Sequence, residues 1–374
     1  MAMDTEFVSE GRYIPELSLV QLAWGEPEAP QAAVIDFLEV GLDGLAPILQ
    51  LLERTDVDTV AHSARQDIGL LVARFGVAPK SFVDTQIAAM FAGIGEQIGY
   101  GSLVSSLLGL SLDKSAQFTD WLARPVSRKK LRYAFSDVVH LPRVWAHLHR
   151  RLRERGRLSW TREESQLMAD EVKGPAAPED AFREVKGWRG LRPAQLVLLR
   201  TLAGWRQREA LDNNLPLSWI LPDRAMIELC RARNPSSRTL RSIRGIGDGT
   251  VRRYGAAILG QLANASGEPP SVERSRKPSL TPRGTLWAAI LQTVVQSRCL
   301  QEEIPSHLVA RKLDAEAVAD WHDRGAQGPE PEVALLTGWR RELAGQLALS
   351  WLRGQVQITA STDDSGVALR ELLD

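Results

Sequence analysis

The chain has 374 residues, of which 44% are apolar and 25% are charged, and its formal net charge at pH 7 is zero. This is the composition of a soluble globular protein that is too long for one ordinary core, and no apolar run approaches the roughly 18 residues that span a bilayer, which excludes a transmembrane protein. Because the N-terminus turns acidic at once, we do not expect it to be a signal or transit peptide. The well-separated Cys230 and Cys299 suit a reducing cytoplasm better than a disulfide or a cysteine-based zinc site.

The first part of the chain is acidic and predicts strands. Arg12 and Arg54 are the only basic residues of segment 1–60. Short apolar stretches at Leu17–Trp24 and Ala33–Phe37, with turn residues between them, are typical of a strand meander. Asp58–His62 predicts a further strand.

Helices are predicted to follow these strands. In Ser63–Phe75 the apolar residues recur at helical spacing, and Gly76 stands where a helix C-cap favours glycine. Asp84 is a predicted N-cap for a helix over Thr85–Ala92. Strands that are first adjacent and then alternate with helices predict an α/β sheet with a catalytic edge.

Residues 124–157 are strongly basic, since Asp137 and Glu154 are their only acidic residues. An acidic region followed by a basic one suits a protein that holds cations and a polyanion together. A solvated helix face would carry the same charges, so the charge pattern alone leaves both interpretations open.

Beyond Arg162 the strand patterns fade. Segments that contain proline and glycine at Glu171–Asp180 and Gly267–Arg283 predict linkers. Helical patterns fill Arg189–Ala263 and Leu286–Leu373, so two helical units of similar size are expected.

Five polar residues of the first region are candidates for one site. Asp4 and Glu6 are two residues apart, so on a strand both side chains point to the same face. Asp67 lies on the helix predicted next, and Tyr133 and Asp137 are four residues apart, which places them on one face of a helix. Each piece alone is a weak indication, but their ordered combination predicts a metal site.

Such a set suits the hydrolysis of a phosphodiester. Two divalent ions about 3.5–4 Å apart can supply the attacking hydroxide, hold the phosphate and neutralise the leaving oxyanion. Mg²⁺ and Mn²⁺ prefer oxygen ligands, which carboxylates provide. A phenol with an ordinary pKa of about 10 orients the attacking water more readily than it deprotonates it.

Short blocks along the first 160 residues carry a resemblance to a known family. The blocks are Met3–Phe7, Tyr13–Leu22, His62–Asp67, Phe82–Ala89, Leu112–Ser115, Thr119–Pro125 and Tyr133–Asp137. With these blocks the chain resembles ribonuclease D, in the tyrosine-containing branch of the DEDD exonuclease superfamily.

The resemblance implies an α/β RNase-H-like (3′-5′ exonuclease) domain and a catalytic set of residues. Asp4, Glu6, Asp67 and Asp137 would bind two divalent metal ions (Mg²⁺ or Mn²⁺), and Tyr133 is the residue that distinguishes this branch. Asp4 would bridge both ions, Glu6 and Asp137 would complete the tighter site, and Asp67 would act on the second ion.

Other residues in these blocks have simpler interpretations. Gln21 is expected to brace its strand, and His62 is expected to be a core histidine. Lys114 either contacts a phosphate or caps a turn. Trp121 and Arg124 either line a substrate channel or pack in the interior.

One departure from the family concerns the start of the chain. The family normally has a helix and a fuller first strand before the Asp-x-Glu motif, whereas three residues precede Asp4 here. Either the true start lies upstream or the first strand is clipped, and a clipped strand would weaken the edge of the sheet.

The helical remainder resembles the HRDC domain over residues 188–266. Its blocks are Leu191–Arg206, Asn213–Pro216 and Ile243–Gly247. The turn at Gly245–Gly247, ahead of Arg252 and Arg253, either presents N–H groups to a phosphate or is a plain turn between helices.

Residues 285–374 look like a second, more divergent HRDC-like helical domain, mainly through Gly338–Leu343. The fold class is therefore an exonuclease domain followed by two all-α HRDC-type domains. The predicted limits are 1–165 for the exonuclease domain, 166–187 for a linker, 188–266 for the HRDC domain, 267–284 for a second linker and 285–374 for the last domain.

The implied function is that of a 3′→5′ exoribonuclease that releases nucleoside 5′-monophosphates and matures the 3′ ends of tRNA precursors and other structured RNA. We expect a cytoplasmic monomer with no membrane partner. A DNA exonuclease on the same scaffold would use the same metal chemistry, and an RNA-binding protein with a decayed site is a second alternative. The absence of a G-x-x-x-x-G-K-[ST] phosphate loop argues against a helicase accessory module.

Overall fold

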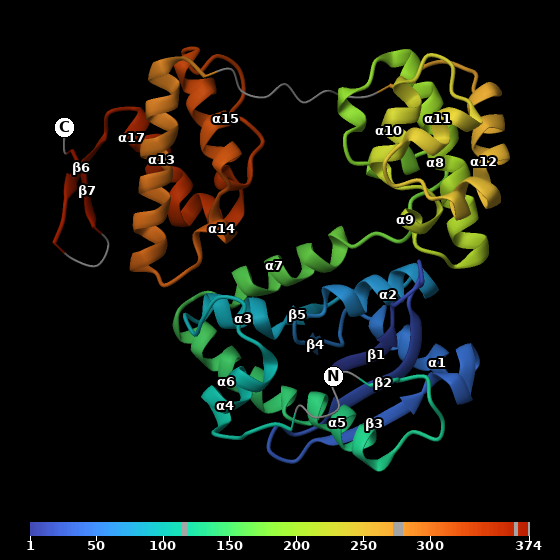
Figure 1. The fold of residues 1–374 in the computed structure, drawn as a ribbon. Coiled ribbons are helices and arrows are strands. Elements are labelled where there is room, and N and C mark those ends of the chain that lie inside the picture. The colour runs from blue at the N-terminus through green and yellow to red at the C-terminus, as the bar shows by residue number, and fades with distance from the viewer. Residues whose placement is uncertain (114–118, 272–279, 363–365, 373–374) are drawn as a thin grey trace. The chain divides into compact units, whose positions relative to one another are not determined.

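The computed structural model describes residues 1–113, 119–271, 280–362 and 366–372, and Figure 1 labels its elements along the chain. The strands are β1 Ala2–Val8, β2 Glu16–Trp24, β3 Gln31–Asp36, β4 Thr59–Ala61, β5 Phe82–Asp84, β6 Val356–Ala360 and β7 Val367–Glu371. The helices up to the first linker are α1 Phe37–Leu52, α2 Arg65–Phe75, α3 Thr85–Phe91, α4 Tyr100–Leu108, α5 Arg128–Val139, α6 Leu141–Glu154 and α7 Leu158–Glu171.

The remaining chain is mostly helical. Its helices are α8 Pro193–Asn213, α9 Leu217–Ile220, α10 Asp223–Arg231, α11 Ser237–Ser242, α12 Asp248–Ala263, α13 Pro282–Gln301, α14 Ser306–Val309, α15 Lys312–Asp323, α16 Gly338–Arg340 and α17 Gln346–Leu352. Short 3-10 turns η1 Ala181–Glu184, η2 Trp188–Gly190 and η3 Ala334–Leu336 and a π-helical turn η4 Arg341–Gly345 connect them. Lys114 and part of the predicted second linker lie outside the described residues.

Five strands form one mixed sheet in the order β3-β2-β1-β4-β5. Strand β1 pairs antiparallel with β2 along its whole length and parallel with β4 through Ala2 and Val60. The prediction of a catalytic edge is therefore wrong, because the strand that carries Asp4 and Glu6 is the central one. The predicted weakening of the sheet edge does not apply to β1 either, because β1 has a neighbouring strand on each side.

The helix boundaries follow from capping chemistry. Helix α2 ends at Gly76, whose φ of 70° is the left-handed conformation that glycine adopts without strain. Helix α3 begins after Asp84, whose side chain accepts a hydrogen bond from the Gln86 backbone N–H at 2.8 Å. These two caps and the predicted strands are confirmed, except that Phe37 begins α1 instead of ending β3.

The two faces of the sheet are covered by different helices. On one face, Met3 and Leu22 pack with Leu45 of α1 and with Leu70 and Leu71 of α2. On the other face, α5 contacts β1, β2 and β3, and the apolar contacts there include Leu19, Trp121 and Ala134. This second face of the sheet is thus covered by α5, a helix that lies within the basic residues 124–157.

Helices α8 to α12 share one core, which confirms the predicted helical segment. Leu196, Leu199, Leu202 and Trp205, the predicted apolar stripe, are all buried in it. The predicted linker before this region holds structure of its own, because α7 extends to Glu171 and η1 packs against the same core.

This helical region hydrogen-bonds to the connection between β1 and β2. The Asn214 side chain, at the C-terminal end of α8, accepts from the backbone N–H groups of Tyr13 at 3.1 Å and Ile14 at 2.8 Å, and it donates to the Ile14 carbonyl. Asn214 is the C-cap of α8, and its φ of 47° is the left-handed conformation that asparagine adopts more readily than most residues.

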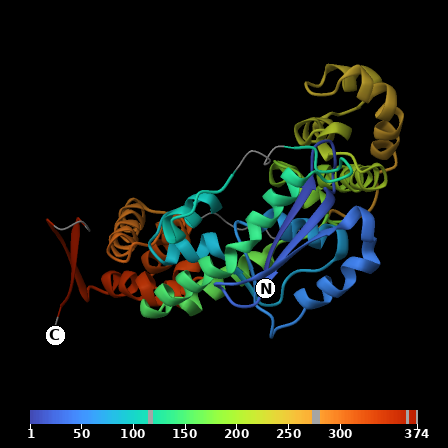
Figure 2. The same cartoon turned by 90° about the horizontal axis from the view of Figure 1, so that it is seen from below.

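The last region is helical only as far as Leu352. Helix α13 begins at Pro282, earlier than the predicted Leu286, and a proline in the first helical turn loses no hydrogen bond. Strands β6 and β7 then form an antiparallel hairpin beside the C-terminus, visible in Figures 1 and 2. The residue pattern of Leu286–Leu373 predicted mostly helix, so this hairpin was not predicted.

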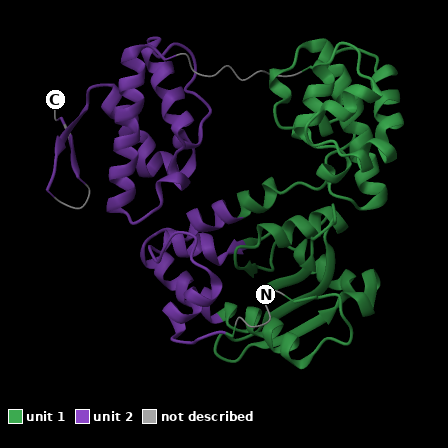
Figure 3. Ribbon diagram, viewed as in Figure 1, with its two compact units in different colours: residues 1–82, 113–142, 166–274 green, residues 83–112, 143–165, 275–374 purple. Residues whose placement is uncertain are grey.

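By their contacts the residues group into two compact units (Figure 3). One unit consists of residues 1–82, 113–142 and 166–274, and the other of residues 83–112, 143–165 and 275–374. The predicted domain limits stay a prediction. Among the described residues, no helix combines the length and the apolar character needed to cross a membrane.

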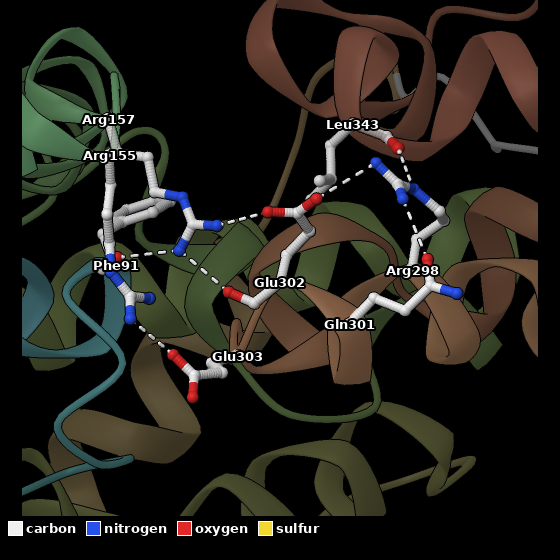
Figure 4. A network of polar contacts seen from close by, with 8 residues as sticks. All are labelled: Phe91, Arg155, Arg157, Arg298, Gln301, Glu302, Glu303 and Leu343. Carbon is white, nitrogen blue, oxygen red and sulfur yellow. Dashed lines mark hydrogen bonds and ion pairs between the residues drawn. The ribbon is translucent and has the colours of Figure 1, made fainter. Parts of the chain in front are cut away.

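The second unit contains a network of paired charges (Figure 4). Arg157 is 5% exposed and donates to the carbonyl oxygens of Phe91 at 3.1 Å and Glu302 at 2.8 Å. Its guanidinium also pairs with the Glu302 carboxylate at 2.5 Å, and Arg298 donates to the same carboxylate at 3.2 Å. Both terminal nitrogens of the Arg157 guanidinium thus face acceptors, which is how a buried charge becomes tolerable.

Candidate active site

Three acidic side chains gather over the central strand. Asp4 and Glu6 lie on β1 and point to the face that α5 covers, since Glu6 is opposite Leu19, which packs against that helix. Asp137 lies on α5, and one carboxylate oxygen from each of the three acids lies within 4.8 Å of the others. The fold therefore joins the Asp-x-Glu pair to an acid far away in the sequence.

Asp67 is close to this group but is not a member of it. It lies in the first turn of α2, it is 8% exposed, and its carboxylate accepts a hydrogen bond from the Thr5 hydroxyl. Its charge nevertheless acts on Asp4 and Glu6, since it raises the pKa of both. The four predicted acids are thus neighbours, with Asp67 held to one side by Thr5.

Burial and mutual repulsion make ionisation of these acids unfavourable. Burial, followed by the charges of Asp67 and Asp137, raises the pKa of Asp4 well above its ordinary value. Burial, followed by the charge of Asp137, raises the pKa of Glu6 to about 9. No arginine or lysine of the described residues lowers the pKa of either group. Among the residues that the structure describes, the cluster therefore has no compensating positive charge.

Tyr133 and Asp137 form a pair one helical turn apart on α5. Burial raises the pKa of Asp137 to about 7, and the hydrogen bond from Tyr133 opposes part of that rise. Burial, followed by the charges of Asp137 and Glu6, raises the pKa of the Tyr133 phenol above its ordinary value of 10.0. The phenol therefore stays protonated at neutral pH and acts as a hydrogen-bond donor.

The sequence left open whether Trp121 and Arg124 line a substrate channel or pack in the interior, and both make packing or polar contacts within the fold. The Trp121 ring is 4% exposed and lies 6.0 Å from the Tyr133 ring, so it packs behind the phenol. Arg124 pairs with Asp36 at 2.6 Å and donates to the Trp121 carbonyl at 2.8 Å. His62 is only partly buried, so the prediction of a core histidine is not met in full.

Two further residues beside the acids were missed or misjudged. Thr5 was passed over because it stands between two acids, yet its hydroxyl orients Asp67. Gln21, expected to brace its strand, is completely buried, and neither polar atom of its amide has a hydrogen-bond partner among the described residues. Its backbone position directly opposite Asp4 follows from the strand register and could not be read from the sequence alone.

The structure of the turn at Gly245–Gly247 favours a plain turn between helices over a turn that binds a phosphate. Gly247 caps α12, and Ile246 is buried against the core. Asp248 lies in the first turn of α12, where its negative charge opposes the approach of a phosphate. Arg252 and Arg253 are exposed on the same helix.

Comparison with known proteins covers both the sheet and the helices. The family described as 3′-5′ exonuclease matches residues 1–153, and the HRDC domain family matches residues 195–262. A protein from Granulibacter bethesdensis named ribonuclease D is 38% identical over 95% of this chain and 88% of its own length. Its counterpart in Acidiphilium cryptum is also 38% identical, over 96% of this chain and 89% of its own length.

A solved structure has the same architecture over most of the chain. The crystal structure of Escherichia coli RNase D, described as an exoribonuclease involved in structured RNA processing, matches with a TM-score of 0.79 at 28% identity. The match covers 94% of this chain and 92% of that one. It therefore includes the acid-bearing sheet as well as the helices that follow.

Proposed function

The chain belongs to the ribonuclease D family and is a hydrolytic 3′→5′ exoribonuclease, and on this premise we propose that it removes nucleoside 5′-monophosphates from RNA with the help of two divalent metal ions. Its proposed substrates are tRNA precursors and other structured RNA with a free 3′ end, processed in the cytoplasm by a monomer. The observation that carries the proposal is the group formed by Asp4, Glu6 and Asp137.

The donor set fits hard divalent cations. The ligand atoms on offer are carboxylate oxygens, which Mg²⁺ and Mn²⁺ prefer to nitrogen or sulfur. The raised pKa values of Asp4, Glu6 and Asp137 mean that the cluster resists ionisation until positive charge enters it. A bound cation supplies that charge, so metal binding and ionisation of the acids would occur together.

We assign the residues as follows. Asp4 would contact both ions, Glu6 and Asp137 would complete the tighter site, and Asp67 would serve the second. When bound, two ions about 3.5–4 Å apart would activate a water and neutralise the charge that develops on the phosphate and the leaving oxygen. Thr5 would keep one Asp67 oxygen occupied and so fix the direction of the other.

Tyr133 would orient the attacking water and would not remove its proton. Its raised pKa keeps the hydroxyl protonated, so its Oη can donate to one oxygen and accept from a water. Trp121 behind the ring and the bond to Asp137 limit where that hydroxyl can point. This division gives Tyr133 a smaller share of catalysis than any of the metal ligands.

The test uses RNA labelled at its 5′ end, incubated with Mg²⁺ or Mn²⁺, and a DNA strand of matched sequence. We expect stepwise shortening of the RNA from its 3′ end, release of nucleoside 5′-monophosphates, and loss of activity with EDTA or in Asp137→Ala. Asp43→Ala, an exposed acid on α1, is the matched control and should keep full activity.

Full activity of Asp137→Ala would overturn the site assignment. Equal rates on the DNA strand would overturn the preference for RNA and leave the hydrolytic chemistry intact. Comparison of a tRNA precursor that carries a 3′ extension with an unstructured RNA of equal length tests the substrate, since only faster trimming of the precursor supports tRNA maturation.

A further inference from the structure

Gln21 has a buried side chain that its surroundings do not satisfy. The residue lies in the middle of β2, is completely buried, and neither its Nε2 nor its Oε1 finds a hydrogen-bond partner among the described residues. A buried amide without partners destabilises a fold, so such groups are rare in native proteins. Its backbone is already hydrogen-bonded in the sheet between β1 and β3, so the amide does not serve to hold the strand.

In the strand register, one of the two cross-strand partners of Gln21 is polar. Gln21 is the direct cross-strand partner of Asp4 in β1 and of the apolar Val34 in β3. Directly opposed side chains on antiparallel strands point to the same face, with Cβ atoms roughly 4.5–5.5 Å apart. The Gln21 side chain therefore points to the face that α5 covers, as does that of Asp4, the acid proposed to contact both ions.

Two other acids near Asp4 each accept a hydrogen bond from a neutral side-chain hydroxyl. Asp67 accepts a hydrogen bond from the Thr5 hydroxyl, and Asp137 accepts one from the Tyr133 hydroxyl. Within the part of the chain that the structure describes, the hydrogen bond that lowers the pKa of Asp4 comes from the backbone of Thr5, and no side-chain hydrogen bond contributes to that pKa. Gln21 is placed to donate such a bond, because an amide N–H donates to a carboxylate without adding charge.

We propose that Gln21 is a positioning residue that turns the Asp4 carboxylate toward a divalent cation by donating its Nε2–H to the Asp4 oxygen that faces β2. This inference rests on the proposed metal-dependent function. An oxygen that accepts from Gln21 leaves its partner oxygen directed at the ion, and a group behind a metal ligand commonly changes metal affinity about 10- to 100-fold. In the metal-free protein the same amide has nothing to stabilise.

The experiment compares Gln21→Met with Leu22→Met. Methionine has nearly the volume of glutamine but no amide, and Leu22 is the next residue on β2, buried on the opposite face of the sheet. Mn²⁺ binding is measured by calorimetric titration of the full chain, and thermal unfolding is followed in EDTA and again with saturating Mn²⁺.

We expect Gln21→Met to bind Mn²⁺ about 10- to 100-fold more weakly while its melting temperature in EDTA stays equal to or above that of the parent. Leu22→Met should keep the parent's Mn²⁺ affinity. Unchanged affinity in Gln21→Met, with the parent binding normally, would overturn the role of Gln21 alone. A lower melting temperature in EDTA with unchanged affinity would show that the amide is structural, which also overturns it.

A parent protein that binds no Mn²⁺ would overturn the metal-dependent function together with this inference. Gln21→Glu provides a second variant, since its side chain keeps the length but presents a fourth acid beside Asp4. Its affinity for Mn²⁺ should fall at neutral pH, and an affinity equal to the parent's would contradict donation by Nε2.

Discussion

The acidic cluster on β1 and the arginine network of the second unit are both buried polar groups, and they are built on opposite principles. In the network, Arg157 faces two carbonyl oxygens and the Glu302 carboxylate, and that carboxylate also receives Arg298. In the cluster, Asp4 and Glu6 face other acids, and no arginine or lysine of the described residues compensates them. The first arrangement is complete without a ligand and the second is not.

The difference is the one expected between a structural group and the proposed catalytic group. Charges that satisfy one another stabilise the packing of their own elements, so their removal should reduce stability. Like charges held together store unfavourable energy that a cation can release, so removal of one acid should reduce function and leave stability unharmed. The following variants and conditions test this contrast between the two groups.

The largest effect is expected from Asp4→Asn. If Asp4 binds both ions as proposed, its loss would remove several kcal/mol of transition-state stabilisation, so exonuclease activity should fall by about 1,000-fold or more. Because the change also removes repulsion, the melting temperature in EDTA at pH 8 should not fall. Steady-state rates and thermal unfolding measure the two effects, with Asp43→Asn as the control. A large loss of stability without loss of activity would contradict the contrast.

The next effect concerns Arg157→Ala. Arg157→Ala removes the donor that the carbonyl oxygens of Phe91 and Glu302 share, while the Glu302 carboxylate keeps Arg298. Since buried acceptors that lose their donor cost about 1–3 kcal/mol each, the free energy of unfolding should fall by about 2–5 kcal/mol. Arg155→Ala is the matched control, since Arg155 pairs with the exposed Glu303 at 2.7 Å and such a pair contributes about 0–1 kcal/mol. Urea unfolding of both variants decides the matter, and equal losses would show that burial does not govern this network.

Tyr133→Phe should have a moderate effect. The change removes one hydrogen bond to a charged group, about 1.5–3 kcal/mol, which corresponds to a loss of activity of about 10- to 100-fold. Mn²⁺ affinity should change little, since the phenol is not a ligand in the proposed site. A loss as complete as that of Asp4→Asn would assign the phenol a proton-transfer role instead.

The last expected effect is a dependence of stability on pH in the metal-free protein. The folded protein keeps protons on Asp137 and Glu6 up to pH values of about 7 and about 9, whereas the ordinary values are 3.8 and 4.5. The free energy of unfolding in EDTA should therefore be highest below these ordinary values and fall as the pH rises through 7 and 9. Saturating Mn²⁺ should offset this decline. Urea unfolding at several pH values measures it, and a rise in stability with pH would contradict the raised pKa values.

Local chemistry explains which parts of this molecule were predictable. The caps at Gly76 and Asp84 and the spacing of Tyr133 from Asp137 depend on residues within one helical turn. The alternation of Asp4 with Glu6 depends on neighbours along one strand. Their elements were therefore predicted correctly, and the resemblance to ribonuclease D is confirmed by relatives that match almost the whole chain.

Features that depend on distant partners were not predictable. The central position of β1 follows from pairing with β2 and β4, and the pairing of Gln21 with Asp4 follows from that register. The contact of Arg157 with Glu302 joins residues 145 positions apart. The β6–β7 hairpin was missed because short apolar stretches fit helix and strand patterns equally well.

The most direct test of the account is the location of bound cations. Crystals of the protein soaked with Mn²⁺ would reveal the ions by their anomalous scattering. The account predicts two peaks about 3.5–4 Å apart, with Asp4 contacting both and with Glu6 and Asp137 sharing one of them. A single peak, or peaks away from these carboxylates, would contradict it.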